Sequence, residues 1–108
     1  MNRYNIFDTG NSYVDDSLEN FLIHGFEPGG FLTSVLANDL RLAISRADHW
    51  NKNNLERIVD EVMYKMPDIS NGSYSRVRDW CRDADGRRTR YAEYLREANI
   101  IKKLQSVT

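Results

Sequence analysis

The chain has 108 residues, of which 41% are hydrophobic and 29% charged, and its formal net charge is −1. This length supports one domain with a single core, and no apolar run approaches the roughly 18–20 residues that a membrane span needs. The N-terminus has no apolar signal core and the lone cysteine, Cys81, cannot form an intramolecular disulfide, so we expect a single cytoplasmic domain over residues 1–108.

Residues 1–14 carry turn-forming residues between scattered aromatics, which predicts a short irregular arm held against the body. A first helix is predicted over 17–24, opened by an acidic capping box. Gly25 follows at the position where a helix favours a left-handed residue, so the sequence predicts that this helix ends there.

Two interpretations are open for the glycine pair that precedes the next helix. A helix N-terminus offers free N–H groups to an anion, so Gly29 and Gly30 form a candidate anion-binding site with Arg76. Against this, the neighbouring Glu27 would repel an anion. A proline start at Pro28 and two small residues also suit a close joint between two helices, which is our leading interpretation.

One long helix is predicted over 29–47, because its apolar residues recur with the helical period. The centre of the apolar stripe is formed by Leu32, Leu36, Leu40, Ala43 and Ala47. The whole stripe covers over half the circumference, which is wider than a surface helix needs. Phe31, Val35 and Leu42 lie on one flank that little else in the chain can cover. We therefore expect a homodimer that buries this flank.

Asp39 falls on the apolar side of that predicted helix. A buried carboxylate is costly unless it is paired or hydrogen-bonded. We therefore expect Asp39 to cap a neighbouring helix or to bind an arginine such as Arg57 or Arg76. An acid–base role would need a second carboxylate, and none is evidently placed with it.

Three further helices are predicted over 54–66, 74–84 and 87–98. Pro67 ends the first of them, because the residue before a proline is pushed out of the helical region. No segment alternates apolar and polar residues for long enough to indicate a strand. The predicted fold is therefore all-α, a compact bundle of about five helices.

Catalytic and metal-binding patterns are weak. The two histidines, His24 and His49, lack metal spacing with each other or with Cys81. Cys81 lies on the apolar side of its predicted helix, which favours a packed thiol over a nucleophile. We expect no metal, no cofactor and no enzymatic activity.

The segment 76–90 contains six arginines and three aspartates. Arginines beside aromatic residues can bind phosphates and stack on bases, but nucleic-acid-binding domains are usually far more basic than this chain. A solvated helix face, an acidic protein partner and a phosphate-bearing ligand are the three interpretations. The candidate partner-binding residues are Trp80, Arg82, Arg87, Arg88 and Arg90.

Part of the chain resembles a group of small, mostly uncharacterised proteins encoded by phages and prophages. The resemblance is carried by GFEPGGFLTSVLANDL at 25–40, SRAD at 45–48, the helix at 55–64, the Gly-Ser pair at 72–73 and Trp80. It covers about half of the chain and includes no residue with an assigned role. It implies a phage origin and a location in the cytoplasm of the host cell, where small phage accessory proteins often act on host machinery or defence.

The leading hypothesis is therefore a non-catalytic binding protein, a phage accessory or counter-defence factor that inhibits a host protein by occluding it. The alternative is a protein that binds a phosphate-bearing nucleotide or nucleic acid through the segment 76–90 and the helix start at Gly29 and Gly30.

Overall fold

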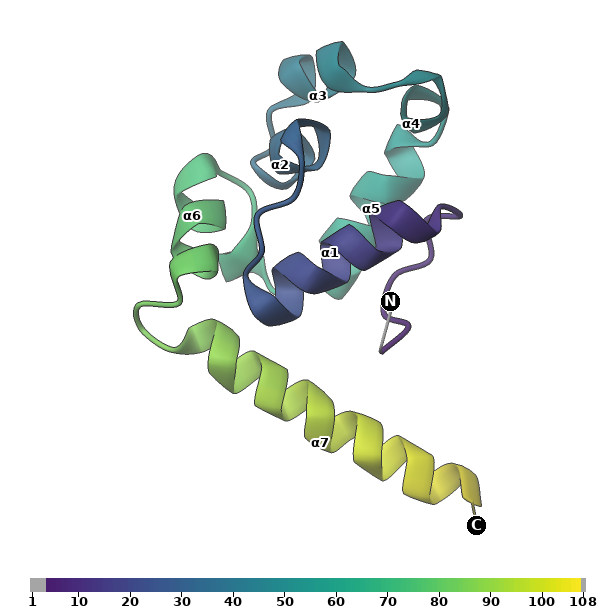
Figure 1. Ribbon diagram of the computed structural model, residues 1–108, viewed down its shortest axis with the longest axis vertical. Helices are drawn as coiled ribbons and strands as arrows, with labels where there is room; N and C mark the ends of the chain where they lie inside the picture. Colours follow the sequence, from purple (N-terminus) through teal and green to yellow (C-terminus); the bar gives the residue numbers. More distant parts are fainter. Residues whose placement is uncertain (1–3, 108) are drawn as a thin grey trace.

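Helices form all of the regular structure in the described part of the chain, which confirms the all-α prediction (Figure 1). The computed structural model describes the backbone of residues 4–107 and the side chains of residues 4–98. Seven α-helices and one 3₁₀ helix occur in these residues, where about five helices were predicted. They are α1 (Ser12–His24), α2 (Gly30–Leu36), α3 (Leu40–Arg46), α4 (His49–Asn53), α5 (Leu55–Lys65), η1 (Asp68–Ser70), α6 (Tyr74–Arg82) and α7 (Arg87–Val107).

The irregular arm is shorter than predicted, because α1 already begins at Ser12. Asn11 caps this helix and accepts a hydrogen bond from the second backbone N–H beyond it. The arm is held against the body, as expected. Phe7 is buried in the core, and Thr9 donates both its backbone N–H and its hydroxyl to Asp15. The buried Asp15 carboxylate therefore fixes the turn that leads into α1.

The end of α1 follows the prediction. Gly25 has a φ of +69°, in the left-handed region. Its N–H donates to the Phe21 carbonyl at 3.0 Å, and the N–H of Phe26 donates to the Asn20 carbonyl at 3.3 Å. The bond from Gly25 to Phe21 is the one that defines an αL C-cap, which ends the helix and satisfies one of its last carbonyls.

The single helix predicted over 29–47 is wrong, because the chain breaks it into α2 and α3. Asn38 has a φ of +61°, which asparagine tolerates better than most residues. Asp39 then caps α3 and accepts a hydrogen bond from the Leu42 N–H at 3.3 Å. The strong N-cap preference of aspartate has outweighed the apolar periodicity that continues through this point.

Asp39 is consequently a half-buried capping residue and has neither of the predicted arginine partners. Its second carboxylate oxygen accepts a hydrogen bond from the Tyr74 hydroxyl at 2.6 Å. Arg57 instead donates to the backbone carbonyl and the carboxylate of Asp8 in the arm. Arg76 donates to backbone carbonyls near its own helix. Asp39 thus connects the start of α3 to α6.

The helix predicted over 54–66 corresponds to α5, whose buried side chains include Ile58 and Val62. Met66 leaves the helical region, with φ −105° and ψ +145°, before Pro67, as predicted. The short helix α4 that precedes α5 was not expected. It is capped by Asp48, whose side chain accepts a hydrogen bond three residues on.

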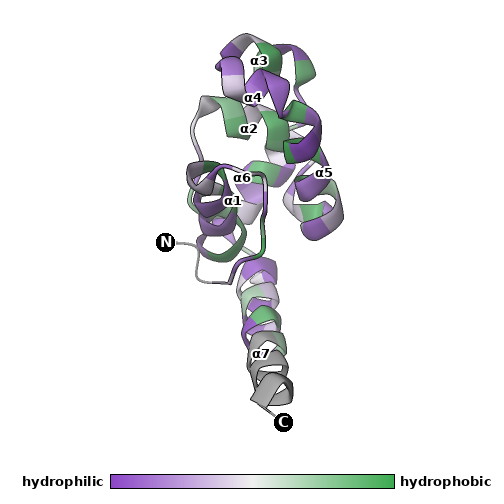
Figure 2. Ribbon diagram, turned by 90° about the vertical axis from the view of Figure 1, so that its right-hand side faces the viewer, coloured by the Kyte–Doolittle hydropathy of each residue, from purple (hydrophilic) through white to green (hydrophobic). Residues whose placement is uncertain are grey.

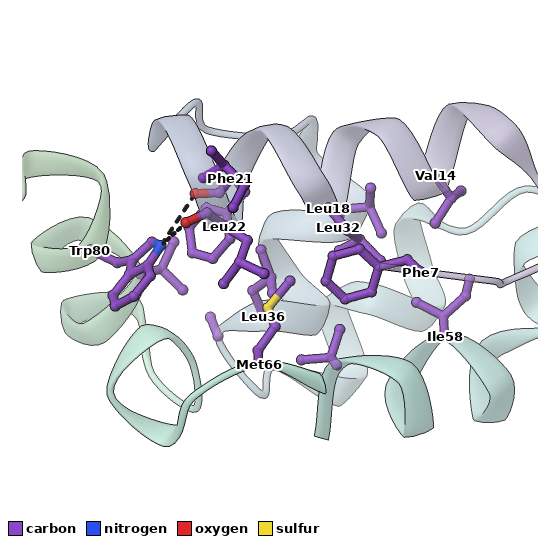
Figure 3. Close-up of a cluster of buried hydrophobic side chains, with 14 of the residues drawn as sticks. Phe7, Val14, Leu18, Phe21, Leu22, Leu32, Leu36, Ile58, Met66 and Trp80 are labelled. Atoms are coloured by element: carbon purple, nitrogen blue, oxygen red, sulfur yellow. Dashed lines mark hydrogen bonds between the residues drawn. The ribbon is translucent and has the colours of Figure 1, made fainter. Parts of the chain in front are cut away.

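The core is centred on α1 (Figure 3). Its most deeply buried apolar side chains are Leu18, Phe21, Leu22, Leu36 and Ile58. Trp80 closes one end of this cluster from α6, and its indole N–H donates to the backbone carbonyls of Phe21 and Leu22 at 3.2 and 3.1 Å. Both carbonyls lie in the last turn of α1, where helix carbonyls lack partners further along the helix, and that of Phe21 also accepts the Gly25 N–H.

The longest helix, α7, contacts α1 and then leads away from the other helices (Figures 1 and 2). Ala92 on this helix is buried, and Tyr91 and Leu95 pack partly buried against the core. Within the described residues, no helix is both long enough and apolar enough to cross a membrane.

Candidate functional site

The arginines of helix α6 lie on two different sides of the helix. Val77 and Trp80 form its buried ridge. The helical repeat places Arg76 on one side of this ridge and Arg78 and Arg82 on the other. We call the first side the Arg76 face and the second the Arg78 face.

The Arg76 face carries balanced charge. It borders a depression of about 420 Å³ that four aspartates and three arginines line. The Arg76 guanidinium is used within the fold, donating to the carbonyls of Asp68 and Asn71 at 3.3 Å each. With its cations and carboxylates nearly equal in number, this depression has no strong preference for an anion.

Arg88, which also lines that depression, is a structural residue. Its side chain is only 17% exposed, and it donates from Nε to the Trp80 carbonyl at 3.0 Å and from Nη1 to the Ile23 carbonyl at 3.1 Å. Trp80 itself is 3% exposed. The predicted partner-binding role of these two residues is therefore not supported, because both are buried and hydrogen-bonded within the fold.

Arg87 and Arg90 remain accessible but paired. Arg87 forms an ion pair of 2.7 Å with Asp85, in which both side chains are 56% exposed. Arg90 donates to the backbone carbonyl of Asp85 at 3.1 Å. Exposed pairs of this kind contribute about 0–1 kcal/mol, so a partner could displace them at little cost.

The Arg78 face carries unbalanced charge. Arg78 and Arg82 are both exposed, and neither guanidinium has a hydrogen bond or ion pair with the described residues. They border a depression of about 500 Å³, to which Glu27 contributes from the connection between α1 and α2. The sequence-based set included Arg82 but omitted Arg78. The spacing of four residues between the two arginines is the signal that could have found it.

The remaining polar groups of the Arg78 face are engaged within the fold. The Thr33 hydroxyl donates to the Pro28 carbonyl at 2.9 Å, and the Tyr74 hydroxyl donates to Asp39. Burial, and secondly the nearby Glu27 carboxylate, raises the pKa of the half-buried Cys81 thiol. Cys81 is therefore a neutral packed thiol, in line with its predicted place on the apolar side.

The predicted anion site is not assembled. Gly29 and Gly30 border a separate depression with Tyr13 and Phe31, whereas Arg76 borders the balanced one. The cation beside the glycines is Arg46, which donates to the Gly30 carbonyl at 3.3 Å. A Cβ at Gly30 would lie 2.9 Å from this guanidinium. Gly30 is therefore closely approached by α3, whereas a Cβ at Gly29 would meet nothing within 4 Å. The close joint predicted between the first helix and the helix that follows it is not supported by these contacts.

The flank predicted to mediate self-association is largely covered. Phe31 and Val35 are partly buried against the core, and Leu42 is half-buried. The turn at Asn38 causes the difference, because it gives α2 and α3 separate directions. The homodimer remains a prediction, but the exposed apolar flank from which it was inferred is not present in the fold.

In the residues that the structure describes, no group of three or more histidine, cysteine or acidic side chains could hold a metal ion. Comparisons of the chain with protein-family models, curated proteins and solved structures found no match.

Proposed function

We propose that this protein is a non-catalytic binding protein that occludes a surface of another protein, using the Arg78 face of α6. The observation that carries the proposal is the unequal use of the arginines. Arg76 and Arg88 donate to backbone carbonyls, whereas Arg78 and Arg82 are exposed beside a depression of about 500 Å³ and have no partner among the described residues. Unpaired cations around a concave surface favour association with an acidic partner.

The resemblance over 25–40 to phage and prophage proteins extends this proposal. The protein is a phage accessory or counter-defence factor, and its partner is a host protein that it inhibits by covering it. Occlusion requires a complementary surface but no reactive group. This suits a surface whose one thiol, Cys81, has a raised pKa and whose hydroxyls are hydrogen-bonded internally.

The test is affinity capture from host-cell lysate with three matched baits: the wild type, the double variant R78S/R82S and the control R87S/R90S. Each variant removes two exposed arginines. We expect the wild type and the control to retain the same protein after nuclease treatment, and R78S/R82S to lose it. Equal retention by all three baits would contradict the proposal. Retention that disappears with nuclease, or a large thermal shift with nucleotides, would favour the nucleotide or nucleic-acid alternative.

A further inference from the structure

The two arginines of the Arg78 face, which have no partner among the residues that the structure describes, have a defined spacing. Arg78 and Arg82 are four residues apart on α6, which places their Cβ atoms about 5–6 Å from each other on one side of the helix. Two glutamates at the same spacing on another helix present carboxylates with a matching separation. Each arginine can then meet one carboxylate through paired N–H donors.

Apolar surface also lines the depression between these arginines and α2. The Tyr74 ring is exposed there, and the half-buried, neutral Cys81 thiol behaves as a small hydrophobic group. A ligand that only supplied negative charge would leave this apolar surface in contact with water. A complementary ligand therefore also carries an aliphatic side chain between its two carboxylates.

Glu27 sets a third requirement. Its carboxylate is exposed and borders the same depression, but it comes from the connection between α1 and α2 rather than from α6. A nucleic acid or polyphosphate carries negative charge along its whole length and would meet Glu27 as well as the arginines. A peptide helix can turn carboxylates toward α6 and a lysine toward Glu27, so the charge pattern favours a protein ligand over a phosphate chain.

We infer that the Arg78 face binds an amphipathic helix with two carboxylates one turn apart, an aliphatic side chain between them and a cation on the side facing Glu27. The inference rests on the proposed binding function and names the chemistry of the partner segment. It assigns Arg78 and Arg82 to affinity and Glu27 to the rejection of phosphate.

Two synthetic helical peptides test the inference by fluorescence anisotropy. The first has glutamates at i and i+4 around a leucine and a lysine on the adjoining side, and the second has the charges exchanged. We expect the wild type to prefer the first peptide by more than about tenfold and R78E/R82E to prefer the second. The matched control R87E/R90E should keep the wild-type preference. Equal affinity of the wild type for both peptides, or the same loss in the control, would overturn the inference.

Glu27→Gln provides an independent readout with inorganic polyphosphate as the probe. We expect the variant to bind polyphosphate more tightly than the wild type, and its affinity for the first peptide to fall by less than that of R78E/R82E. Unchanged polyphosphate binding would remove the role assigned to Glu27. Charge-insensitive peptide binding, combined with loss of the lysate protein by R78S/R82S, would overturn the acidic-helix inference while the binding function stands. Unchanged capture would overturn the function itself.

Discussion

The Arg88 guanidinium occupies the space where a side chain at Gly25 would lie. A Cβ at Gly25 would be 2.6 Å from Nε and 2.7 Å from Cζ of Arg88. The guanidinium is fixed there by the Ile23 and Trp80 carbonyls, one from the end of α1 and the other from α6. The left-handed end of α1 and the start of α7 are therefore fitted to each other.

Gly25→Ala should destabilise the protein for two reasons. A left-handed alanine costs about 1–2 kcal/mol, and the displacement of Arg88 adds an overpacking cost of about 1–3 kcal/mol. Denaturant unfolding should therefore show a loss above about 2 kcal/mol. Gly29→Ala is the control, since φ is −60° there and no atom lies within 4 Å of the added Cβ. Similar losses for both variants would show that Arg88 does not restrict Gly25.

Arg88→Ala should leave the Ile23 and Trp80 carbonyls without their side-chain donor. Unsatisfied buried polar groups cost about 1–3 kcal/mol, whereas Arg87→Ala, which removes an exposed ion pair, should cost no more than about 1 kcal/mol. In the double variant G25A/R88A the steric contact is gone. The stability lost by the double variant should therefore be smaller than the sum of the losses of the two single variants. Strict additivity in a denaturation series would contradict the fitted pair.

Trp80→Phe keeps an aromatic ring in the core but removes the N–H that serves two carbonyls of α1. We expect a loss of about 1–3 kcal/mol in the free energy of unfolding. Partner capture at a temperature where the variant is folded should be unchanged, because Trp80 is buried. Abolished capture by folded Trp80→Phe would return this residue to the binding surface.

Asp39 should titrate below the ordinary range of aspartate. The hydrogen bond from Tyr74, and secondly that from the Leu42 N–H, lower the pKa of Asp39. Because the pKa is lower in the folded state than in the unfolded state, ionised Asp39 stabilises the protein at pH values above the ordinary pKa of about 3.9. This stabilisation is lost as the pH falls through the folded-state pKa. An NMR titration should show the pKa of Asp39 rising toward the ordinary value in Tyr74→Phe. An identical titration in that variant would rule out the hydrogen bond as the main cause.

Features governed by local preferences were predictable from the sequence. The left-handed Gly25 and the end of α5 before Pro67 each depend on a few neighbouring residues. The break at Asn38 was missed because Leu36 and Leu40 keep the helical apolar spacing across it. The indications that two helices replace one are Asn38, since asparagine tolerates a left-handed φ, and Asp39, since aspartate favours the N-cap.

The candidate surface was only partly predictable, because it depends on which arginines form hydrogen bonds within the fold and which remain accessible. Arg88 donates to a carbonyl 65 positions away in the sequence, at Ile23, and no local pattern indicates such a contact. The predicted set omits Arg78, because the sequence of the segment 76–90 does not show which arginines its three aspartates accompany in the fold. The folded helix places Asp79 and Asp83 with Arg76 instead, on the opposite side.

The central claim is that Arg78 and Arg82, rather than the paired arginines, form the binding surface. Calorimetric titration of the purified captured protein with wild type, R78S/R82S and R87S/R90S tests it most directly. We predict that R78S/R82S binds at least about tenfold more weakly, with a flatter salt dependence, while R87S/R90S stays close to the wild type. Wild-type affinity and salt dependence in R78S/R82S would contradict the account.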